Sequence, residues 1–308
     1  MKKTKIGING FGRIGRQLTK LLLENNNIEV VAINDLSNSK TSAHLFKFDS
    51  SYGIYENEVD YNEDEIILNN KVINKISERD PSKINWSDFG VDIVVESTGI
   101  FTNKNDALKH ISGSVKKVII SAPATDEDIT IVFGVNERSY DPSNHQIISN
   151  ASCTTNCVAP MIKVINDNFG IQNALMSTIH SFTNDQSVLD QPHSDLRRAR
   201  TASENIIPTT TGAAKAVVNV IPELKGKIDG MAYRVPTASV SVTDLTFSTE
   251  KNTGVNNLND ELEKASKTYL KNIMQFNKLP LVSQDFKGNS HSVIIDSLST
   301  IQTNNGLY

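Results

Sequence analysis

The 308-residue chain has few cysteines and no long apolar segment. Its two cysteines lie four residues apart, too few for a disulfide framework in a chain of this length, so free thiols in a reducing compartment are expected. The N-terminus, MKKTKIGINGFGRIGR, lacks the apolar stretch of a secretory signal, and no run approaches the length of a membrane span. We therefore expect a cytoplasmic protein.

The chain also lacks a large excess of positive or negative charge. Lysine and arginine number 31, aspartate and glutamate 35, and the formal net charge is -4. Such a balance gives no overall attraction to nucleic acid or to an anionic membrane, so we expect neither as a specific partner. Hydrophobic residues make up 38% of the chain, enough for a sizeable core, and its length favours two domains.

The first half of the chain alternates short apolar runs with amphipathic stretches. Its expected strands are KIGIN (5–9), IEVVAIN (28–34), VDIVVES (91–97), VKKVIIS (115–121) and QIIS (146–149). Between the first two, Ile14, Leu18, Leu21 and Leu22 recur at the spacing of one helical face. Strand, helix and strand within about 30 residues form a βαβ unit. We predict an α/β domain with a mainly parallel sheet over residues 1–150.

The second half, residues 151–308, has longer and partly alternating strand patterns. These are ALMSTIH (174–180), MAYRV (231–235), ASVSVTDLTF (238–247) and SVIID (292–296). Helical faces occur at 155–167 and in a stretch where Leu258, Leu262, Ala265, Tyr269 and Ile273 recur. This half is predicted to be an α+β catalytic domain with a mixed or antiparallel sheet. The polar, basic segment 181–212 is too long for a routine connection, which favours a functional loop.

A glycine-rich loop follows the first expected strand. Gly10, Gly12 and Gly15 form G-x-G-x-x-G, which opens an amphipathic helix, and Asp35 ends the second strand twenty residues after Gly15. This context predicts a Rossmann-type dinucleotide site, because glycines let the backbone approach a pyrophosphate at a helix start. Asp35 would accept hydrogen bonds from the ribose hydroxyls and repel a 2′-phosphate, which favours NAD over NADP. The alternatives are an ordinary glycine turn and a solvated acid at a strand end.

The stretch IISNASCTTNCVAP (147–160) contains both cysteines. Cys153 is expected at a strand-to-helix turn, where the helix dipole and unpaired N–H groups stabilise a thiolate. Lowering a thiol pKa from ~8.5 to ~6 requires about 3.4 kcal/mol, and a helix terminus typically contributes ~0.3–1 kcal/mol. Cys153 therefore needs a second partner. Cys157 lies one turn deeper and reads as a small core residue. A structural thiol at position 153 and a redox dithiol are the alternatives, and no metal ligands can be placed around the pair.

A histidine is the expected partner, and His180 ends the first strand of the second half, where a strand terminus can face the cysteine helix. A histidine at a strand end is often incidental. Three further features near it indicate an anion site: Arg197, Arg198 and Arg200 cluster in DLRRAR, Arg234 lies inside an apolar strand, and Thr209, Thr210, Thr211 and Gly212 precede a helix. A solvated charge run or subunit contact, and simple helix capping, are the alternatives.

These motifs together resemble phosphorylating glyceraldehyde-3-phosphate dehydrogenase. The resemblance rests on NGFGRIGR, ESTG, VIISAP, SNASCTTNC, TNDQ, DLRRAR, ENIIPTTTGAAKAV and PELKGKIDGMAYRVPT, covers almost the whole chain and is most specific in SNASCTTNC. It implies a glycolytic, NAD-dependent enzyme in which Cys153 attacks the aldehyde of glyceraldehyde 3-phosphate and His180 takes the hemithioacetal proton. Inorganic phosphate would then cleave the thioester to give 1,3-bisphosphoglycerate.

The resemblance also implies roles for other residues. The substrate phosphate would be held by Thr183 and Arg234 with Arg198 nearby, and the inorganic phosphate by Ser152, Thr154, Thr211 and Gly212. The NAD site would be lined by the glycine loop, with Gly10 and Gly12, and by Arg13, Ile14, Asp35, Arg79, Thr98 and Ser121. Pro192 would reach that site from a neighbouring subunit of a homotetramer. Gln191 stands where NAD-specific relatives usually carry leucine, and TASVSV after RVP also departs from the family pattern.

The family continues beyond the position of Tyr308 through a last strand, a WYDNE-type motif and a terminal helix. We therefore expect that the C-terminal helix and an asparagine that normally binds the nicotinamide carboxamide are missing. This expectation keeps two alternatives open beside an active enzyme. One is erythrose-4-phosphate dehydrogenase, a sister enzyme, and the other is a truncated, catalytically impaired NAD-binding protein.

Overall fold

The computed structural model describes residues 2–304 and 306–308. Contacts along the backbone divide the chain into two compact units, each of which is described by itself. The first is Met1–Ile131 with Tyr140–Ala151, and the second is Val132–Ser139 with Ser152–Tyr308. No helix within the described residues is both long enough and apolar enough to cross a membrane.

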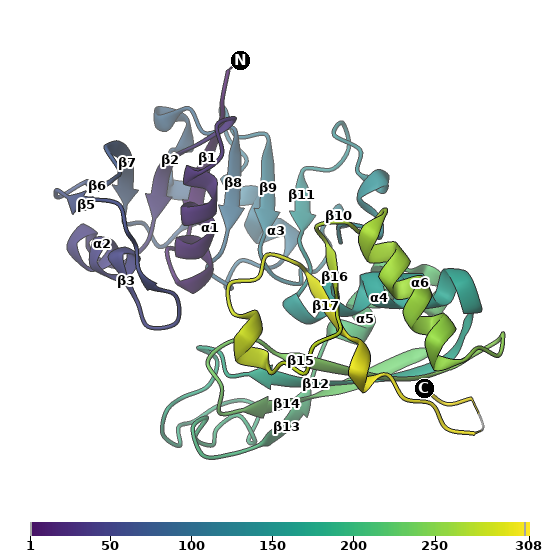
Figure 1. The fold of residues 1–308 in the computed structure, drawn as a ribbon. Helices are drawn as coiled ribbons and strands as arrows, with labels where there is room; N and C mark the ends of the chain where they lie inside the picture. Colours follow the sequence, from purple (N-terminus) through teal and green to yellow (C-terminus); the bar gives the residue numbers. More distant parts are fainter. Residues whose placement is uncertain (1, 305) are drawn as a thin grey trace. The chain divides into compact units, whose positions relative to one another are not determined.

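The first unit is built on a nine-stranded sheet (Figure 1). The strand order is β10-β11-β9-β8-β1-β2-β7-β6-β5, and every pair from β10 to β7 is parallel, whereas β7, β6 and β5 form an antiparallel meander. The predicted mainly parallel sheet is confirmed. The strands are β1 (Thr4–Asn9), β2 (Ile28–Asn34), β5 (Val59–Tyr61), β6 (Glu65–Leu68), β7 (Lys71–Ile76), β8 (Ile93–Glu96), β9 (Lys117–Ile120), β10 (Ile129–Thr130) and β11 (Ile147–Ser149).

Two apolar clusters cover the two faces of this sheet. Neighbouring residues of β8 illustrate the alternation, because Val95 belongs to one cluster and Val94 to the other. Helices α1 (Arg13–Leu23), α2 (Ser39–Lys47) and α3 (Lys104–Ala107), together with three short 3-10 helices and the small hairpin β3 (Phe48–Asp49) and β4 (Gly53–Ile54), complete the described part of the unit. The sequence patterns gave no expectation for α2 or for strands β3 to β7.

The predicted apolar face of α1 is partly wrong. Leu18 and Leu22 pack against the core, as expected, but Ile14 and Leu21 are 53% and 66% exposed. The spacing of four residues could not show that the buried stripe of this helix is narrow, because that depends on the elements around it.

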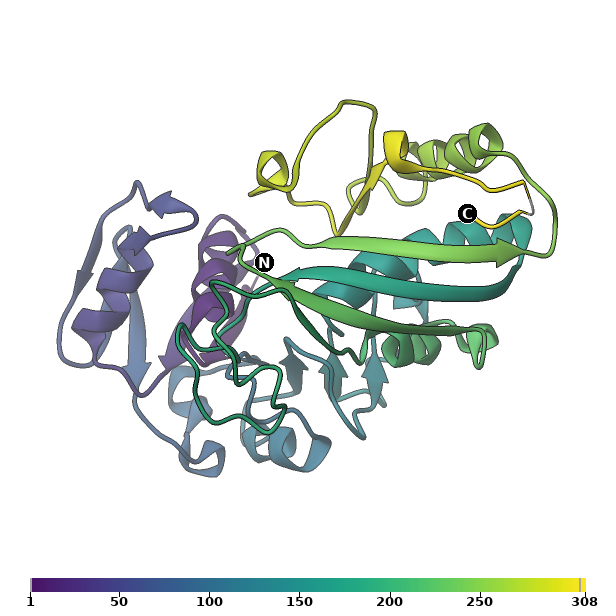
Figure 2. The ribbon, with the colours of Figure 1, turned by 90° about the horizontal axis from the view of Figure 1, so that it is seen from below.

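The second unit contains a four-stranded mixed sheet in the order β13-β14-β12-β15. The central pair β12–β14 is parallel, and both flanking pairs are antiparallel. Figure 2 shows the long strands side by side. They are β12 (Ile171–Ser181), β13 (Ile207–Thr210), β14 (Ile228–Val235) and β15 (Val242–Thr249), and a separate parallel pair is β16 (Met274–Asn277) with β17 (Val293–Asp296). The predicted mixed sheet is confirmed.

Three helices lie over one face of this sheet: α4 (Cys153–Phe169), α5 (Ala213–Val220) and α6 (Val255–Lys267) (Figure 1). Helix α4 contacts both α5 and α6. The prediction that one helical face continues to Ile273 is wrong, because α6 ends at Lys267 and turns follow. Asn272 there adopts a φ of 67°, which is outside the helical region.

The chain between β12 and β13 contains neither helix nor strand. Several of its apolar side chains are exposed: Phe182, Val188, Leu189, Leu196 and Ile206. Its end differs from the expectation of a simple helix cap, because Thr209 and Thr210 belong to strand β13 and only Thr211 and Gly212 precede α5.

Candidate active site and dinucleotide site

Cys153 is the first residue of α4, and Ser152 caps the helix. The Ser152 hydroxyl accepts a hydrogen bond from the Thr155 N–H at 3.0 Å, and the two hydroxyls of these residues lie 2.7 Å apart. The Cys153 side chain is exposed. Its sulfur therefore stands at the end of a helix where unpaired N–H groups and the dipole favour a negative charge.

His180 approaches Cys153 from strand β12. Its Nε2 atom lies 3.3 Å from Sγ of Cys153, while its Nδ1 atom lies 2.6 Å from the carbonyl oxygen of Ser181. Nδ1 thus faces both an acceptor, the Ser181 carbonyl, and a donor, the Arg234 guanidinium, whereas Nε2 faces the thiol. Nε2 is therefore the ring nitrogen placed to exchange a proton with Cys153.

The environment of Cys153 lowers the pKa of its thiol. Partial removal from water raises this pKa, but the hydrogen bond and the charge of His180, with the hydroxyl and N–H of Thr154, outweigh that effect. The pair thus supplies the second stabilising partner that a helix terminus alone could not provide.

Cys157 has the opposite environment. Burial raises the pKa of its thiol to about 11, although a hydrogen bond with Thr243 acts against this rise, and the neighbouring Cys153 adds to it. The structure therefore separates a thiol whose pKa is lowered from a thiol that remains protonated at neutral pH.

Arg234 lies beside His180 on strand β14. Its Nη1 donates to the Ser181 carbonyl at 3.0 Å and to the Thr183 hydroxyl at 3.4 Å, and it approaches Nδ1 of His180 to 2.9 Å. Its Nε is buried without a hydrogen-bond partner. Burial, followed by the charge of Arg198, lowers the pKa of this guanidinium. A partly buried arginine with an unused donor beside an exposed hydroxyl can bind an anion.

The arginines of DLRRAR contact their own loop and strand β13. Arg198 donates to the Asp185 carboxylate at 2.7 Å, to the Thr209 hydroxyl at 3.0 Å and to the Thr210 carbonyl at 3.2 Å. Arg200 pairs with Asp190 at 2.8 Å. The cluster is thus partly neutralised by acids that the sequence motif did not indicate.

The residues predicted to bind inorganic phosphate lie where two helices of the second unit begin. The Thr211 hydroxyl accepts from the Ala213 N–H at 3.2 Å, and Gly212 is the residue that begins α5. Thr154 is buried in the first turn of α4, next to Ser152. Helices α4 and α5 contact each other, and each presents backbone N–H groups at its N-terminus.

The predicted dinucleotide residues of the first unit lie along the carboxyl edge of the parallel sheet. Asn9 pairs in register with Asn34 and Glu96, and Glu96 pairs with Ile120. The residues that directly follow these four strand ends therefore meet at one edge, where the strand order changes direction around β1, which is the usual place for a dinucleotide. They include Gly10, Asp35, Thr98 and Ser121.

The glycine loop fits a dinucleotide. Gly10 has a φ of 92°, and a Cβ atom there would lie 2.7 Å from the backbone nitrogen of Thr98. A Cβ atom on Gly12, the residue that precedes α1, would meet nothing within 4 Å. The loop thus leaves open space at a helix N-terminus, as a bound pyrophosphate requires.

Asp35 accepts hydrogen bonds from the Phe11 N–H at 2.9 Å, the Ser37 N–H at 2.9 Å and the Ser37 hydroxyl at 2.6 Å. Burial raises the pKa of this carboxyl, but Ser37, Phe11 and the charge of Lys75 hold it below its usual range. An ionised carboxylate next to the glycine loop fits a ribose diol and disfavours a 2′-phosphate.

The remaining predicted cofactor residues either have partners of their own or are exposed. The Arg13 guanidinium is bound by Asp49 at 2.8 Å and by the Ser51 hydroxyl at 2.7 Å. Ile14 and Arg79 are exposed, and the Ser121 N–H donates to the Glu96 carbonyl at 3.0 Å. Pro192 belongs to the second unit, in the exposed loop after β12.

Sequence reasoning missed three buried polar residues at this edge: Asn9, Asn34 and Glu96. A signal was present, because Glu96 interrupts the apolar run VDIVVES just where a strand should be buried on both faces.

Two models of known protein families match the chain. Residues 4–104 match the model described as "Glyceraldehyde 3-phosphate dehydrogenase, NAD binding domain", and residues 152–308 match "Glyceraldehyde 3-phosphate dehydrogenase, C-terminal domain". The chain is 58% identical over 298 residues to glyceraldehyde-3-phosphate dehydrogenase 1 of Bacillus cereus, which covers 97% of this chain and 89% of the relative. The corresponding enzyme of Geobacillus stearothermophilus is 56% identical over 297 residues, which is 96% of this chain and 89% of that protein. The chain belongs to the glyceraldehyde-3-phosphate dehydrogenase family.

Proposed function

We propose that the protein is an NAD-dependent enzyme that oxidises glyceraldehyde 3-phosphate in the presence of inorganic phosphate to 1,3-bisphosphoglycerate, as a step of glycolysis. The observation that carries this proposal is the 3.3 Å approach of His180 Nε2 to Cys153 Sγ at a helix start. Membership of the family supports the substrate and the cofactor. The two alternatives, a sister enzyme acting on erythrose 4-phosphate and an impaired NAD-binding protein, are not favoured by these relatives.

The reaction begins with Cys153. Its thiolate, formed by transfer of the thiol proton to His180, attacks the aldehyde carbon, and the carbonyl oxygen takes that proton back from His180 to become the hydroxyl of a hemithioacetal. His180 takes the proton of that hydroxyl through Nε2 as the carbon is oxidised to a thioester. Gly10, Gly12 and Asp35 would hold NAD+, which would supply the two-electron oxidant for this carbon as a hydride acceptor. Inorganic phosphate then attacks the thioester carbon, and Cys153 leaves as a thiolate.

Two anion sites would position the reactants. Arg234 and Thr183 hold the C3 phosphate of the substrate in this proposal, since the Arg234 guanidinium lies beside the exposed Thr183 hydroxyl. Arg198 adds its charge from nearby, although it is already paired with Asp185. The inorganic phosphate is held by Ser152, Thr154, Thr211 and Gly212, where α4 and α5 begin.

The cofactor site is assigned to the carboxyl edge of the parallel sheet. Gly10 and Gly12 receive the pyrophosphate, and Asp35 binds the adenosine ribose. Arg13, Ile14, Arg79, Thr98 and Ser121 complete the site in this proposal.

We further propose that the protein is a homotetramer in which Pro192 contacts the cofactor of a neighbouring subunit. The exposed side chains Val188, Leu189 and Leu196, which are 75%, 72% and 82% exposed, support an interface on the loop after β12. A cytoplasmic location suits a free catalytic thiol, which requires a reducing compartment.

The test is an assay of NADH formation by the purified protein. We expect NADH to form from glyceraldehyde 3-phosphate only when inorganic phosphate is present, and more slowly from erythrose 4-phosphate. Cys153→Ser should abolish turnover, whereas Cys157→Ser should retain most of it. Full turnover by Cys153→Ser would exclude the covalent mechanism, and a faster rate with erythrose 4-phosphate would favour the sister activity.

A further inference from the structure

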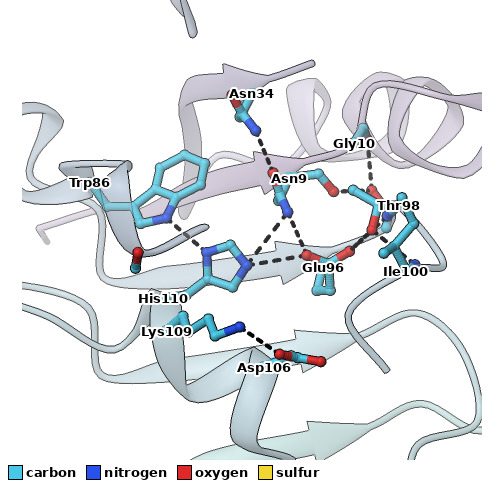
Figure 3. Close-up of polar contacts among 12 residues, drawn as sticks. Asn9, Gly10, Asn34, Trp86, Glu96, Thr98, Ile100, Asp106, Lys109 and His110 are labelled. Atoms are coloured by element: carbon cyan, nitrogen blue, oxygen red, sulfur yellow. Dashed lines mark hydrogen bonds and ion pairs between the residues drawn. The ribbon is translucent and has the colours of Figure 1, made fainter. Parts of the chain in front are cut away.

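A row of buried polar side chains runs beneath the carboxyl edge of the parallel sheet (Figure 3). It passes from Asn34 through Asn9, Glu96 and His110 to Trp86. Each of these residues is at most 4% exposed. Burying so many polar groups is costly unless every donor meets an acceptor.

The indole of Trp86 determines the protonation of His110. Its N–H group lies 3.0 Å from Nδ1 of His110 and can only donate. Nδ1 must therefore carry a lone pair, which places the single ring proton on Nε2. That proton points at the Glu96 carboxylate, 3.1 Å away. The His110–Glu96 contact is thus a hydrogen bond from a neutral ring to a carboxylate.

Asn34 fixes the orientation of Asn9 in the same manner. Asn34 Nδ2 donates to Asn9 Oδ1 at 2.6 Å, so Asn9 directs its own amide N–H to Glu96 Oε2 at 2.5 Å. Asn34 also exchanges two hydrogen bonds of 2.8 Å with the backbone of Glu78, after strand β7. Two donors, from Asn9 and His110, therefore converge on one oxygen of Glu96.

The other oxygen of Glu96 holds Thr98. Glu96 Oε1 accepts from the Thr98 N–H at 2.8 Å and from the Thr98 hydroxyl. Among the ion pairs of the described residues, none joins Glu96 to a lysine or arginine. The carboxylate is therefore stabilised by four neutral donors, and half of them belong to Thr98.

Thr98 in turn packs closely against Gly10 of the glycine loop. A Cβ atom on Gly10 would lie 2.7 Å from the Thr98 nitrogen and 2.8 Å from its Cγ2. The Ser97 hydroxyl donates to the Gly10 carbonyl at 2.7 Å. The row of side chains thus joins the loops that follow β1, β2, β7 and β8, which are four of the loops assigned to the cofactor.

We propose that Glu96 is a positioning residue for NAD, whose carboxylate, oriented by Asn9 and His110, holds Thr98 against Gly10 and so keeps the cofactor edge in its binding geometry. Binding to an edge that is already ordered avoids the entropy of ordering it. This inference rests on the assignment of Gly10 and Thr98 to the NAD site made above.

Glu96→Gln is the informative substitution, because it keeps the size of the side chain. If its oxygen faces Thr98, its amide group meets the donors of Asn9 and His110. His110 cannot reverse its tautomer while the Trp86 N–H occupies Nδ1. We expect the Kd for NAD+, measured by titration calorimetry, to rise about tenfold or more. The alkylation rate of Cys153 without NAD+ should stay near that of the wild type, since Cys153 belongs to the other unit.

A second variant tests the tautomer. In Trp86→Phe/Glu96→Gln the indole N–H is removed, so His110 can place its proton on Nδ1 and accept from the glutamine amide. The double variant should therefore bind NAD+ more tightly than Glu96→Gln alone. A merely structural role predicts the reverse, because the second substitution would add damage. Glu29→Gln, an exposed position on β2 of the same unit, is the matched control.

The outcomes separate this inference from the site assignment. Thr98→Val should weaken NAD+ binding by itself, and its effect should not add to that of Glu96→Gln if Glu96 acts through Thr98. An unchanged Kd in Thr98→Val would refute the assigned site. An unchanged Kd in a folded Glu96→Gln variant, or additive effects, would overturn the role of Glu96. Should Glu96→Gln not fold, Trp86→Phe alone is expected to raise the Kd about threefold, and an unchanged value would also overturn the inference.

Discussion

His180 and Arg234 stand at the same level of the parallel pair β12–β14, and both direct a nitrogen at the carbonyl oxygen of Ser181. The residue assigned to take a proton and the residue assigned to hold the substrate phosphate therefore share one backbone acceptor. A change in either side chain is transmitted to the other through the position of that carbonyl.

Arg234→Leu should consequently affect two kinetic parameters. We expect the KM for glyceraldehyde 3-phosphate to rise at least about tenfold, because a buried charge-assisted contact is lost, and kcat to fall because His180 loses a neighbour that fixes its carbonyl partner. Steady-state kinetics would measure both. Arg138→Leu, at an exposed position, should change neither. A wild-type KM in Arg234→Leu would contradict the assigned anion site.

The two thiols should differ in alkylation. At pH 7 a thiol with a pKa of about 11, such as that of Cys157, is thiolate in only about one molecule in ten thousand. The pKa of Cys153 is lowered, so its thiolate persists to lower pH than that of an ordinary cysteine. Brief iodoacetamide treatment followed by mass spectrometry should show modification at Cys153.

The role of His180 can be read from the pH profile of the same reaction. His180→Asn removes the hydrogen bond and charge that lower the Cys153 pKa, so the midpoint of the alkylation rate should move to higher pH. A profile identical to that of the wild type would show that the helix start alone activates the thiol.

Asp35→Asn should weaken the discrimination between NAD and NADP. The substitution removes the negative charge that repels a 2′-phosphate, and it also places an amide N–H near the donors of Phe11 and Ser37. We expect NAD+ affinity to fall about tenfold and the ratio of NAD to NADP affinity to fall further. Calorimetric titration with each cofactor would measure the ratio, and an unchanged ratio would argue against the ribose assignment.

Substitution by alanine should have different effects on stability at two glycines of the first unit. A Cβ atom on Gly7 would lie 2.7 Å from the ring of Trp86, which is fully buried, so Gly7→Ala should lower the free energy of unfolding by about 1–3 kcal/mol. Gly12→Ala meets nothing within 4 Å and should leave stability unchanged while weakening NAD binding. Thermal unfolding followed by the fluorescence of the single tryptophan would measure the first effect. Equal melting temperatures for the two variants would contradict it.

Much of the first unit could be predicted from sequence, because its strands are apolar runs bounded by turns and its glycine loop has a strict spacing. The position of Cys153 at a helix start could be predicted equally well, since Ser152 is a typical N-cap residue and Gly170 ends the helix. Strands β5 to β7 were not predicted, because short and partly polar strands such as Lys71–Ile76 carry little periodicity.

Less of the candidate site than of the fold could be predicted from the sequence. The resemblance supplied the roles of Thr183, Arg198 and Ser152, because their residue types alone do not say which anion each would bind. The pairing of Arg198 with Asp185 lies within one irregular loop, whose conformation no sequence period indicates. The row ending at Trp86 joins segments that are distant in the sequence, and its contacts become visible only when the register of the strands is known.

The outermost strands of the nine-stranded sheet, β10 and β5, span only Ile129–Thr130 and Val59–Tyr61. A strand of two or three residues offers too few free backbone groups to pair with a foreign chain, and β5 carries Asp60 beside the exposed Tyr61. Because the two outermost strands are so short, the apolar central strands are protected from edge-to-edge aggregation. Lengthening either outermost strand with a β-branched insertion would create a template for fibrils without altering the chemistry at the carboxyl edge.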